Sequence, residues 1–107
     1  MTTRKRLPNR RKSKRFTITL GVADIHVSAG EYTDGTLGEI FIDYSREGTF
    51  GRDMVKAFAM SVSIGLQHGV PLETFQHTFR HFKMEPDIVR GVFAELEMHY
   101  APKEVAP

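Results

Sequence analysis

The segment from residue 37 to residue 72 constrains the fold most, because it combines a strand, a glycine-bearing loop and a long apolar helix. Between Met54 and Leu66 only Lys56 is charged, and apolar or small residues surround the helix almost completely. This distribution predicts a buried central helix, which Gly69 ends, with the rest of the chain packed around it.

Small residues recur every four positions along this helix, at Ala57, Ser61 and Gly65. Residues at this spacing lie on one face of a helix. Because a ridge of small side chains lets a neighbour come close, we expect a second helix or the sheet to pack tightly against it.

Three stretches that alternate between apolar and polar residues precede the helix, at 16–20, 25–32 and 37–44. Such alternation is typical of strands with one buried face. Asp34-Gly35 has the composition of a tight hairpin turn in which both residues take positive φ. In the third strand Phe41 shares the polar face with Glu39 and Asp43, so we expect the sheet to be covered mainly on its other side.

Two shorter helices are predicted after the long one. The first begins near Pro71 and has an apolar stripe made of Leu72, Phe75, Phe79 and Phe82. The second runs from Pro86 to Pro102 with a stripe of Ile88, Val89, Val92, Phe93, Leu96 and Tyr100. The fold class is therefore expected to be α+β, with a three-stranded antiparallel meander packed against three helices in a single small domain. The sheet edges could support a homodimer.

Composition narrows the class further. The 107 residues suffice for one domain, and 40% hydrophobic residues with eight Phe can fill one modest core. The absence of cysteine excludes disulfides, thiolate metal sites and thiol-based catalysis within this chain. No apolar run approaches the roughly 18 residues that span a bilayer, and no signal-type segment follows the basic N-terminus, so we expect a cytoplasmic protein without a membrane partner.

The positive charge is concentrated at the N-terminus, where the first fifteen residues hold eight of the fifteen Lys and Arg and no acid. These residues are Arg4, Lys5, Arg6, Arg10, Arg11, Lys12, Lys14 and Arg15. The remaining 7 cations and all 13 acids give the rest of the chain a net charge of −6. We therefore expect a flexible basic arm over 1–14, a domain over 15–102 and a frayed tail over 103–107.

Two interpretations of the arm remain open. It could neutralise the phosphates of nucleic acid or of another anionic partner, or it could be a solubilising tail without a partner. Gly48 and Gly51, with Arg46 and Arg52 beside them, form a GxxG loop before the long helix that resembles the backbone clamp of KH modules. The alternative is an ordinary connection between a strand and a helix, since in KH modules the loop joins two helices.

A second candidate site is Glu73, His77 and His81, which are spaced four apart and could line a divalent-metal stripe. The stripe lies opposite the phenylalanine face of its helix, so we expect it to face solvent and to bind metal only weakly. No nucleophile with an oriented base, no apolar carboxylate pair and no phosphate-loop lysine is visible, so we predict no catalytic residues, no metal and no cofactor.

Several segments resemble the C-terminal region of adenosylcobalamin-dependent (class II) ribonucleotide reductases, the part related to TSCPD domains. The matching pieces are RKRLPNRR at 4–11, GEYTDGTLGEIFID at 30–43, EGTFGRDMVKAFAMSVSIGLQHGVPLETF at 47–75 and FKMEP at 82–86. They keep their order and cover most of the chain up to Pro86.

The resemblance does not imply the whole activity of these reductases. Their chemistry requires a thiyl cysteine, a reducing cysteine pair and a cobalamin-binding barrel, and this chain has no cysteine. TSCPD domains often carry cysteines that suggest metal binding, but the matching segment here is Glu85-Pro86-Asp87, with Glu85 in place of the cysteine. The resemblance therefore implies neither zinc nor cobalamin for this chain.

The sequence thus predicts a stand-alone homologue or a fragment of the reductase domain, non-catalytic by itself, with a binding or regulatory role in deoxyribonucleotide synthesis. A reductase subunit would be its partner. The alternative is a small nucleic-acid-binding protein, bacterial or phage, that uses the arm and the GxxG loop. An independent enzyme has little support.

Overall fold

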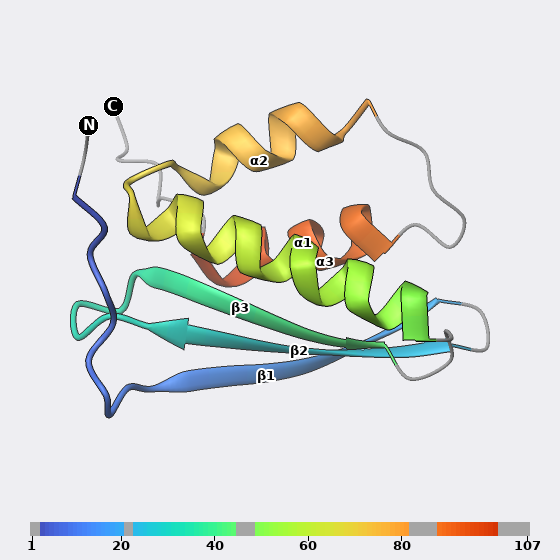
Figure 1. The fold of residues 1–107 in the computed structure, drawn as a ribbon, viewed down its shortest axis with the longest axis horizontal. Coiled ribbons are helices and arrows are strands. Elements are labelled where there is room, and N and C mark those ends of the chain that lie inside the picture. The colour runs from blue at the N-terminus through green and yellow to red at the C-terminus, as the bar shows by residue number, and fades with distance from the viewer. Residues whose placement is uncertain (1–2, 21–22, 45–48, 82–87, 101–107) are drawn as a thin grey trace.

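The structure is a computed structural model that describes residues 3–20, 23–44, 49–81 and 88–100 (Figure 1). Its elements in chain order are β1 (Ser13–Leu20), β2 (Ala23–Glu31), β3 (Leu37–Tyr44), α1 (Thr49–Gln67), α2 (Leu72–Phe79) and α3 (Ile88–Tyr100). The strands form one antiparallel sheet in the order β1-β2-β3, and the helices lie on one side of it. The predicted α+β class and the meander are therefore confirmed.

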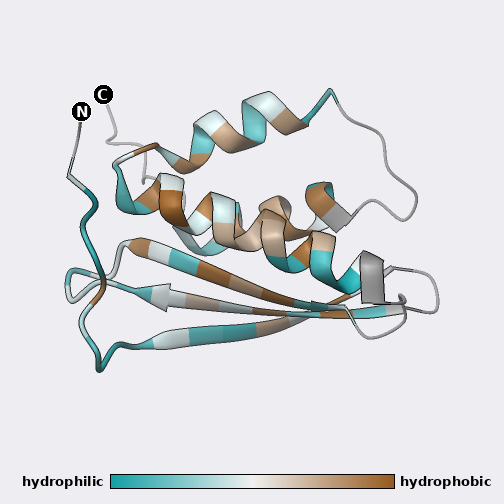
Figure 2. Ribbon diagram, in the orientation of Figure 1, coloured by the Kyte–Doolittle hydropathy of each residue, from teal (hydrophilic) through white to brown (hydrophobic). Residues whose placement is uncertain are grey.

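The strand register separates an inner from an outer sheet face. Phe16, Val27 and Ile42 are cross-strand partners on the inner face, where Val27 and Ile42 are buried. Figure 2 shows apolar residues in every strand and helix. Strand β1 begins at Ser13, three residues before the predicted start, and its pairing with β2 is continuous. Ser13 and Lys14 therefore belong to the sheet and not to an arm.

The turn between β2 and β3 differs from the predicted one. Gly35 has a φ of 85°, but no non-glycine residue among those described has a positive φ, so Asp34 does not. The Gly35 N–H donates to the Tyr32 carbonyl at 2.9 Å, and the Tyr32 N–H donates to the Thr36 carbonyl at 2.9 Å. This is a three-residue loop with the glycine in the left-handed region, which needs only one positive φ.

The core lies between the inner sheet face and the helices. Its buried apolar residues are Ile25, Val27, Ala29, Ile40, Ile42, Tyr44, Ala59, Val62, Leu72, Val89, Val92, Phe93 and Leu96. Phe58, Phe75, Phe79 and Phe93 form an aromatic cluster that joins the three helices, with ring centroids 5.5 to 6.4 Å apart. The predicted stripe of α2 thus contacts the core through Phe75 and Phe79, while Phe82 lies outside the described residues.

Helix α1 is half-buried, so the prediction of a central buried helix is wrong. Met60 and Ile64 are exposed, as are Ala57 and Ser61. The predicted small ridge therefore packs only at Gly65, where a Cβ would come within 2.6 Å of the Phe75 ring. The reason is that α1 lies beside the sheet as well as above it, which leaves one face of the helix in solvent.

Helix α1 also covers the edge of β3. The Ser63 hydroxyl accepts from the Ile40 N–H at 2.8 Å and lies 3.1 Å from the Ile40 carbonyl, and the Gln67 side-chain amide donates to the Gly38 carbonyl at 3.0 Å. These backbone groups face away from β2, so the two side chains take the place of a fourth strand.

The end of α1 follows the sequence prediction. Gly69 has a φ of 90° and its N–H donates to the Leu66 carbonyl at 3.0 Å, while the Val70 N–H reaches the Gly65 carbonyl at 3.0 Å. These two bonds satisfy carbonyls at the helix end in the manner of a Schellman motif, and the chain then enters α2. None of the helices that the structure describes has the length and apolarity needed to cross a membrane.

Candidate functional site

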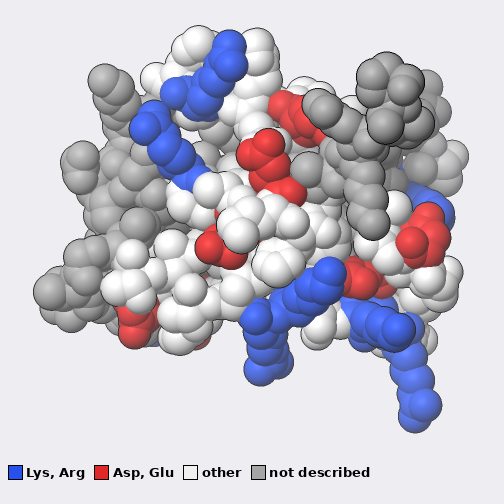
Figure 3. All heavy atoms as spheres, turned by 180° about the vertical axis from the view of Figure 1, so that it is seen from behind, with Lys and Arg blue, Asp and Glu red and all other residues white. Residues whose placement is uncertain are grey.

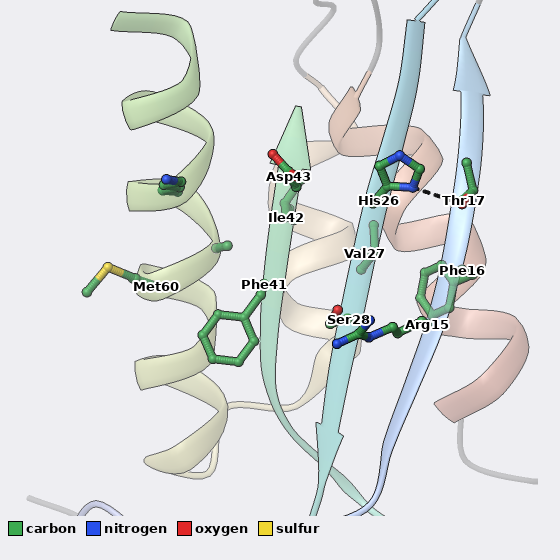
Figure 4. A pocket seen from close by; sticks show the side chains of 12 residues that line it. Arg15, Phe16, Thr17, His26, Val27, Ser28, Phe41, Ile42, Asp43 and Met60 are labelled. Atoms are coloured by element: carbon green, nitrogen blue, oxygen red, sulfur yellow. Dashed lines mark hydrogen bonds between the residues drawn. The ribbon is translucent and has the colours of Figure 1, made fainter. Parts of the chain in front are cut away.

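An open concavity lies on the outer face of the sheet, beside α1 (Figure 4). This outer-face groove has a volume of about 830 Å³. Its floor consists of two cross-strand rows, Arg15-Ser28-Phe41 and Thr17-His26-Asp43. Lys56, Ala59 and Met60 of α1 form its wall. Side chains alternate between the two faces of a strand, and the sequence neighbours of these six floor residues point into the core. The floor residues therefore point to the outer face.

The groove combines exposed apolar side chains with isolated charges. Phe41 is 55% exposed and Met60 is 60% exposed, and both line the groove. The Thr17 hydroxyl lies 3.0 Å from His26 Nδ1. Within the described parts of the chain, Arg15 and Lys56 make no ion pair. An aromatic ring and a thioether beside two cations suit contact with a polypeptide or a planar ring better than they suit catalysis.

The first residues of the chain pack against the body along its surface. Arg4 Nε donates to Gln67 Oε1 at 2.7 Å, and the Lys5 N–H donates to the Gln67 carbonyl at 2.7 Å. The Tyr32 hydroxyl donates to the Lys5 carbonyl at 2.5 Å, and the Lys5 ammonium lies 4.6 Å from the centre of the Tyr32 ring. Leu7 lies against Gly38. The segment is thus held by residues of α1, β3 and the β2–β3 turn.

Two further cations of the N-terminal segment pair with buried carboxylates. Arg11 makes a two-armed ion pair with Glu39, whose carboxylate lies on the outer sheet face beside Gly30. Lys14 Nζ lies 3.5 Å from Glu31 Oε2 and 4.9 Å from the centre of the Tyr100 ring. These cations therefore neutralise acids of the body.

The remaining cations of this segment are exposed. Lys12, Arg6, Arg10 and Arg15 form no ion pair or side-chain hydrogen bond within the part of the chain that the structure describes, although the Lys12 carbonyl accepts from the Glu31 N–H. Figure 3 shows basic and acidic side chains interspersed on the face seen there, without a continuous basic patch. The cations of this segment that are available to an external anion are thus fewer than the eight that the first fifteen residues contain.

The second glycine of the predicted GxxG loop, Gly51, lies in a helix and not in a loop. Arg46 and Gly48 lie outside the described residues, while α1 begins at Thr49, so Gly51 and Arg52 belong to the first turns of the helix. Arg52 is exposed. Anion binding by these residues stays a prediction.

The histidine stripe is only partly helical. Helix α2 ends at Phe79, so His81 lies in the turn beyond it. The His77 and His81 ring centroids are 6.2 Å apart, and both residues are exposed, as is Glu73. No group of three potential metal ligands occurs among the residues described, and these three do not form one.

Among the residues that the structure describes, three side chains have shifted pKa values. Burial and the hydrogen bond to Glu31 raise the pKa of the Tyr100 phenol, which donates to Glu31 Oε2 at 2.6 Å. Burial also raises the pKa of Tyr32. Hydrogen bonds from the Thr36 hydroxyl and N–H lower the pKa of the exposed Asp34. All three shifts arise from structural contacts and not from a cluster arranged for proton transfer.

The groove was not predicted from the sequence. The sequence did contain one indication of it, since Phe41 is an aromatic residue on an otherwise polar strand face. The position of α1 beside that face is a tertiary feature that the local sequence does not reveal. Met60 and Lys56 line the groove only because α1 lies along β3.

The comparisons with known proteins all point to the same family. The model of the TSCPD domain matches residues 2–100. The chain is 45% identical over 83 residues to a vitamin B12-dependent ribonucleotide reductase of Agrobacterium fabrum, 36% identical over 114 aligned positions to one of Streptomyces clavuligerus, and 35% identical over 83 residues to one of Rhodopirellula baltica. No solved structure matches significantly.

The matches cover most of this chain but little of its relatives. They include 78%, 94% and 78% of the chain, and 6%, 12% and 8% of the Agrobacterium, Streptomyces and Rhodopirellula proteins. The similarity therefore concerns one small part of a much larger reductase.

Proposed function

The chain belongs to the TSCPD domain family, and from this premise we propose that it is a non-catalytic module that serves deoxyribonucleotide synthesis by docking on a vitamin B12-dependent ribonucleotide reductase. The family relationship and the reductase relatives support the link to that pathway. The role proposed here is binding or regulation, not ribonucleotide reduction.

The outer-face groove is the observation that carries the proposal. Phe41 of β3 and Met60 of α1 are large apolar side chains that the fold leaves exposed, and both residues line the groove. Aromatic and methionine side chains are enriched where proteins bind each other, and a few such residues at the centre of an interface, whose truncation costs about 2 kcal/mol or more, dominate the binding free energy. The groove would therefore receive an apolar segment of the reductase.

The chemistry of the chain supports a non-catalytic role. It contains no cysteine, so it cannot provide the thiyl radical or the dithiol that the resemblance implies for the reductases. The groove does pair the Thr17 hydroxyl with His26 Nδ1 at 3.0 Å, but among the described residues no carboxylate is hydrogen-bonded to His26 to orient it as a base.

The test measures binding of the chain to a catalytic B12-dependent reductase from the same host by calorimetry or surface plasmon resonance. We expect Met60→Ser to weaken binding by about tenfold or more, since that factor corresponds to about 1.4 kcal/mol. Met98→Ser is the matched control, because Met98 is 77% exposed on α3 and does not line the groove. Equal effects of the two substitutions, or no binding by the parent chain, would contradict the proposal.

A second candidate function is nucleic-acid binding, which the exposed Arg6, Arg10, Lys12 and Arg15 favour. If they contact phosphates, the logarithm of affinity should fall with the logarithm of salt concentration by about 0.7 to 0.9 for each contact. Replacing Arg6, Arg10 and Lys12 by Gln should then reduce that slope by about two to three. Absence of binding at low salt would exclude this function.

A further inference from the structure

We propose that two copies of this chain associate through the free edge of β1, antiparallel and about a two-fold axis, to form a continuous six-stranded sheet. The proposal does not rest on reductase docking, because it uses the backbone edge of β1, whereas the exposed apolar residues of the groove, Phe41 and Met60, belong to β3 and α1. Arg15 and Thr17 line the groove and also lie on the β1 edge.

The hydrogen-bond pattern shows which backbone groups β1 leaves free. The Glu31 N–H donates to the Lys12 carbonyl at 2.9 Å, and in the antiparallel register Lys12 lies opposite Glu31. Bonded and non-bonded pairs alternate along an antiparallel ladder. The even-numbered residues of β1 therefore bond to β2, and the backbone groups of Ser13, Arg15, Thr17 and Thr19 face outward.

The other edge of the sheet gives the same pattern independently. The backbone of Ile40 bonds to Ser63, so Ile40 and its partner Ala29 form a non-bonded pair. Ala29 must then direct its backbone groups toward Lys14 in β1. Both edges therefore indicate that the even-numbered residues of β1 direct their backbone groups toward β2.

The two edges of the sheet differ in whether their backbone groups have hydrogen-bond partners. Ser63 and Gln67 satisfy backbone groups of β3, whereas no hydrogen bond within the described residues reaches the outward groups of β1. Strand β1 has eight residues in continuous register, without proline or a bulge. Natural proteins usually block such an edge with charge, a bulge or a covering element, because it readily pairs with another strand.

Charge protects this edge only weakly. Lys14 is directed inward onto Glu31 and the Tyr100 ring, which leaves Arg15 as the one outward charge of β1. Its row in the sheet contains Ser28 and Phe41 and therefore no acid. Arg15 thus has no ionic partner among the residues that the structure describes.

A second copy supplies what the edge lacks. With Thr17 on the two-fold axis, Phe16 of one copy lies opposite Ile18 of the other on the inner face, and Arg15 lies opposite Thr19 on the outer face. The Thr19 hydroxyl donates to Asp24 Oδ1 at 2.9 Å in the adjacent strand. Since strands lie about 4.7–4.9 Å apart, the Arg15 side chain can reach across to Asp24 of the second copy. The symmetry forms this ion pair twice.

The neighbouring register is less favourable. With Phe16 on the axis, Lys14 of one copy would lie opposite Ile18 of the other, and Arg15 would lie opposite Thr17 and farther from Asp24. The side-chain pattern therefore selects the register centred on Thr17. An extended segment of another protein would meet the same backbone groups but not this reciprocal pairing.

The absence of cysteine makes a direct test possible, because one introduced thiol is the only thiol in the chain. In the proposed register the Cα atoms of the two Thr17 residues lie about 5.5 Å apart, a distance that a disulfide spans. Under mild oxidation Thr17→Cys should give a disulfide-linked dimer. Thr19→Cys is the matched control on the same strand face, since its two copies would lie roughly 13 Å apart.

Sedimentation of the unmodified full chain provides the second measurement. We expect a concentration-dependent dimer that Thr17→Pro abolishes, since proline removes an outward N–H that β2 does not use, while Thr17→Val retains it. A parent chain that stays monomeric across the series would overturn the proposal and favour a foreign strand as occupant. Equal cross-linking of Thr17→Cys and Thr19→Cys, or of neither, would overturn the register.

Discussion

At the scale of single residues, several side chains hold more than one segment in place. Tyr100 is the clearest case, because its hydroxyl joins the end of α3 to Glu31 at the end of β2, where Lys14 also lies. Glu31 is 7% exposed and has both a donor and a cation as partners. This arrangement satisfies a buried carboxylate of β2 with groups from two other elements.

The raised pKa of Tyr100 makes stability depend on alkaline pH. The folded state holds the phenolic proton more tightly, so the stabilisation is complete below the unfolded pKa of about 10 and is lost as pH rises above it. Tyr100→Phe should lower the free energy of unfolding by about 1–2 kcal/mol at pH 7 and reduce its decline above pH 10. Denaturant titrations from pH 7 to 11 check this, and an unchanged alkaline decline in the variant would contradict it.

Gly65 offers a second prediction at this scale. A Cβ there would lie 2.6 Å from the Phe75 ring, which is stacked with Phe79 and Phe93. Gly65→Val should therefore destabilise the fold by about 1–3 kcal/mol through overpacking, despite the lower helix propensity of glycine. Ala57→Val is the control, since Ala57 is exposed on the same helix. Equal melting temperatures for the two variants would show that the α1–α2 contact is loose.

At the scale of elements, the pairing of α1 with β3 determines the shape of the domain. The helix follows its strand in sequence, covers the strand edge through Ser63 and Gln67, and forms the wall of the outer-face groove through Met60. A helix packed only over the inner face would leave the edge of β3 open and would form no such wall.

Ser63→Ala tests this pairing. The substitution leaves the N–H and carbonyl of Ile40 buried without their side-chain partner, so the free energy of unfolding should fall by about 1–3 kcal/mol. Ser61→Ala removes the same atom from an exposed position whose hydroxyl bonds only to its own helix. Thermal unfolding of the pair should show a loss for Ser63→Ala alone, and similar losses would disprove the edge role.

Some elements could be predicted from local sequence, and others depended on how α1 packs beside β3. The bounds of β3 and the glycine that ends α1 followed from local chemistry, namely strict alternation and a residue suited to positive φ. The exposure of Met60 did not follow, because the sequence of α1 is apolar almost all round and only the position of β3 decides which face is buried. The turn at Asp34 was mispredicted because a three-residue loop and a two-residue loop share the Asp-Gly signature.

For the whole molecule, the N-terminal cations divide into two groups that the sequence does not distinguish. Arg4 and Arg11 bond to Gln67 and Glu39, whereas Arg6 and Arg10 are exposed without such partners among the described residues. The charge count alone indicated a uniform basic arm. Burial of Glu39, which only the fold reveals, explains the difference.

Paired substitutions separate the two groups. Arg4→Gln with Arg11→Gln should lower the free energy of unfolding by about 2 kcal/mol or more, because Glu39 would keep its burial and lose its cation. Arg6→Gln with Arg10→Gln changes the net charge equally and should cost within about 0.5 kcal/mol. Chemical denaturation of both double variants makes the comparison, and equal destabilisation would mean that the segment is held by backbone contacts alone.

The bonds from Arg4 and Lys5 to Gln67 also imply an order of assembly. They join residues up to 63 positions apart, whereas β2, β3 and α1 follow one another directly along the chain. Closing a long loop costs entropy that local hairpins avoid, so the first residues should attach after the sheet and α1 have formed. In native-state hydrogen exchange the Lys5 amide should then exchange through release of this segment alone, faster than the amides of β2, whose exchange requires the sheet itself to open.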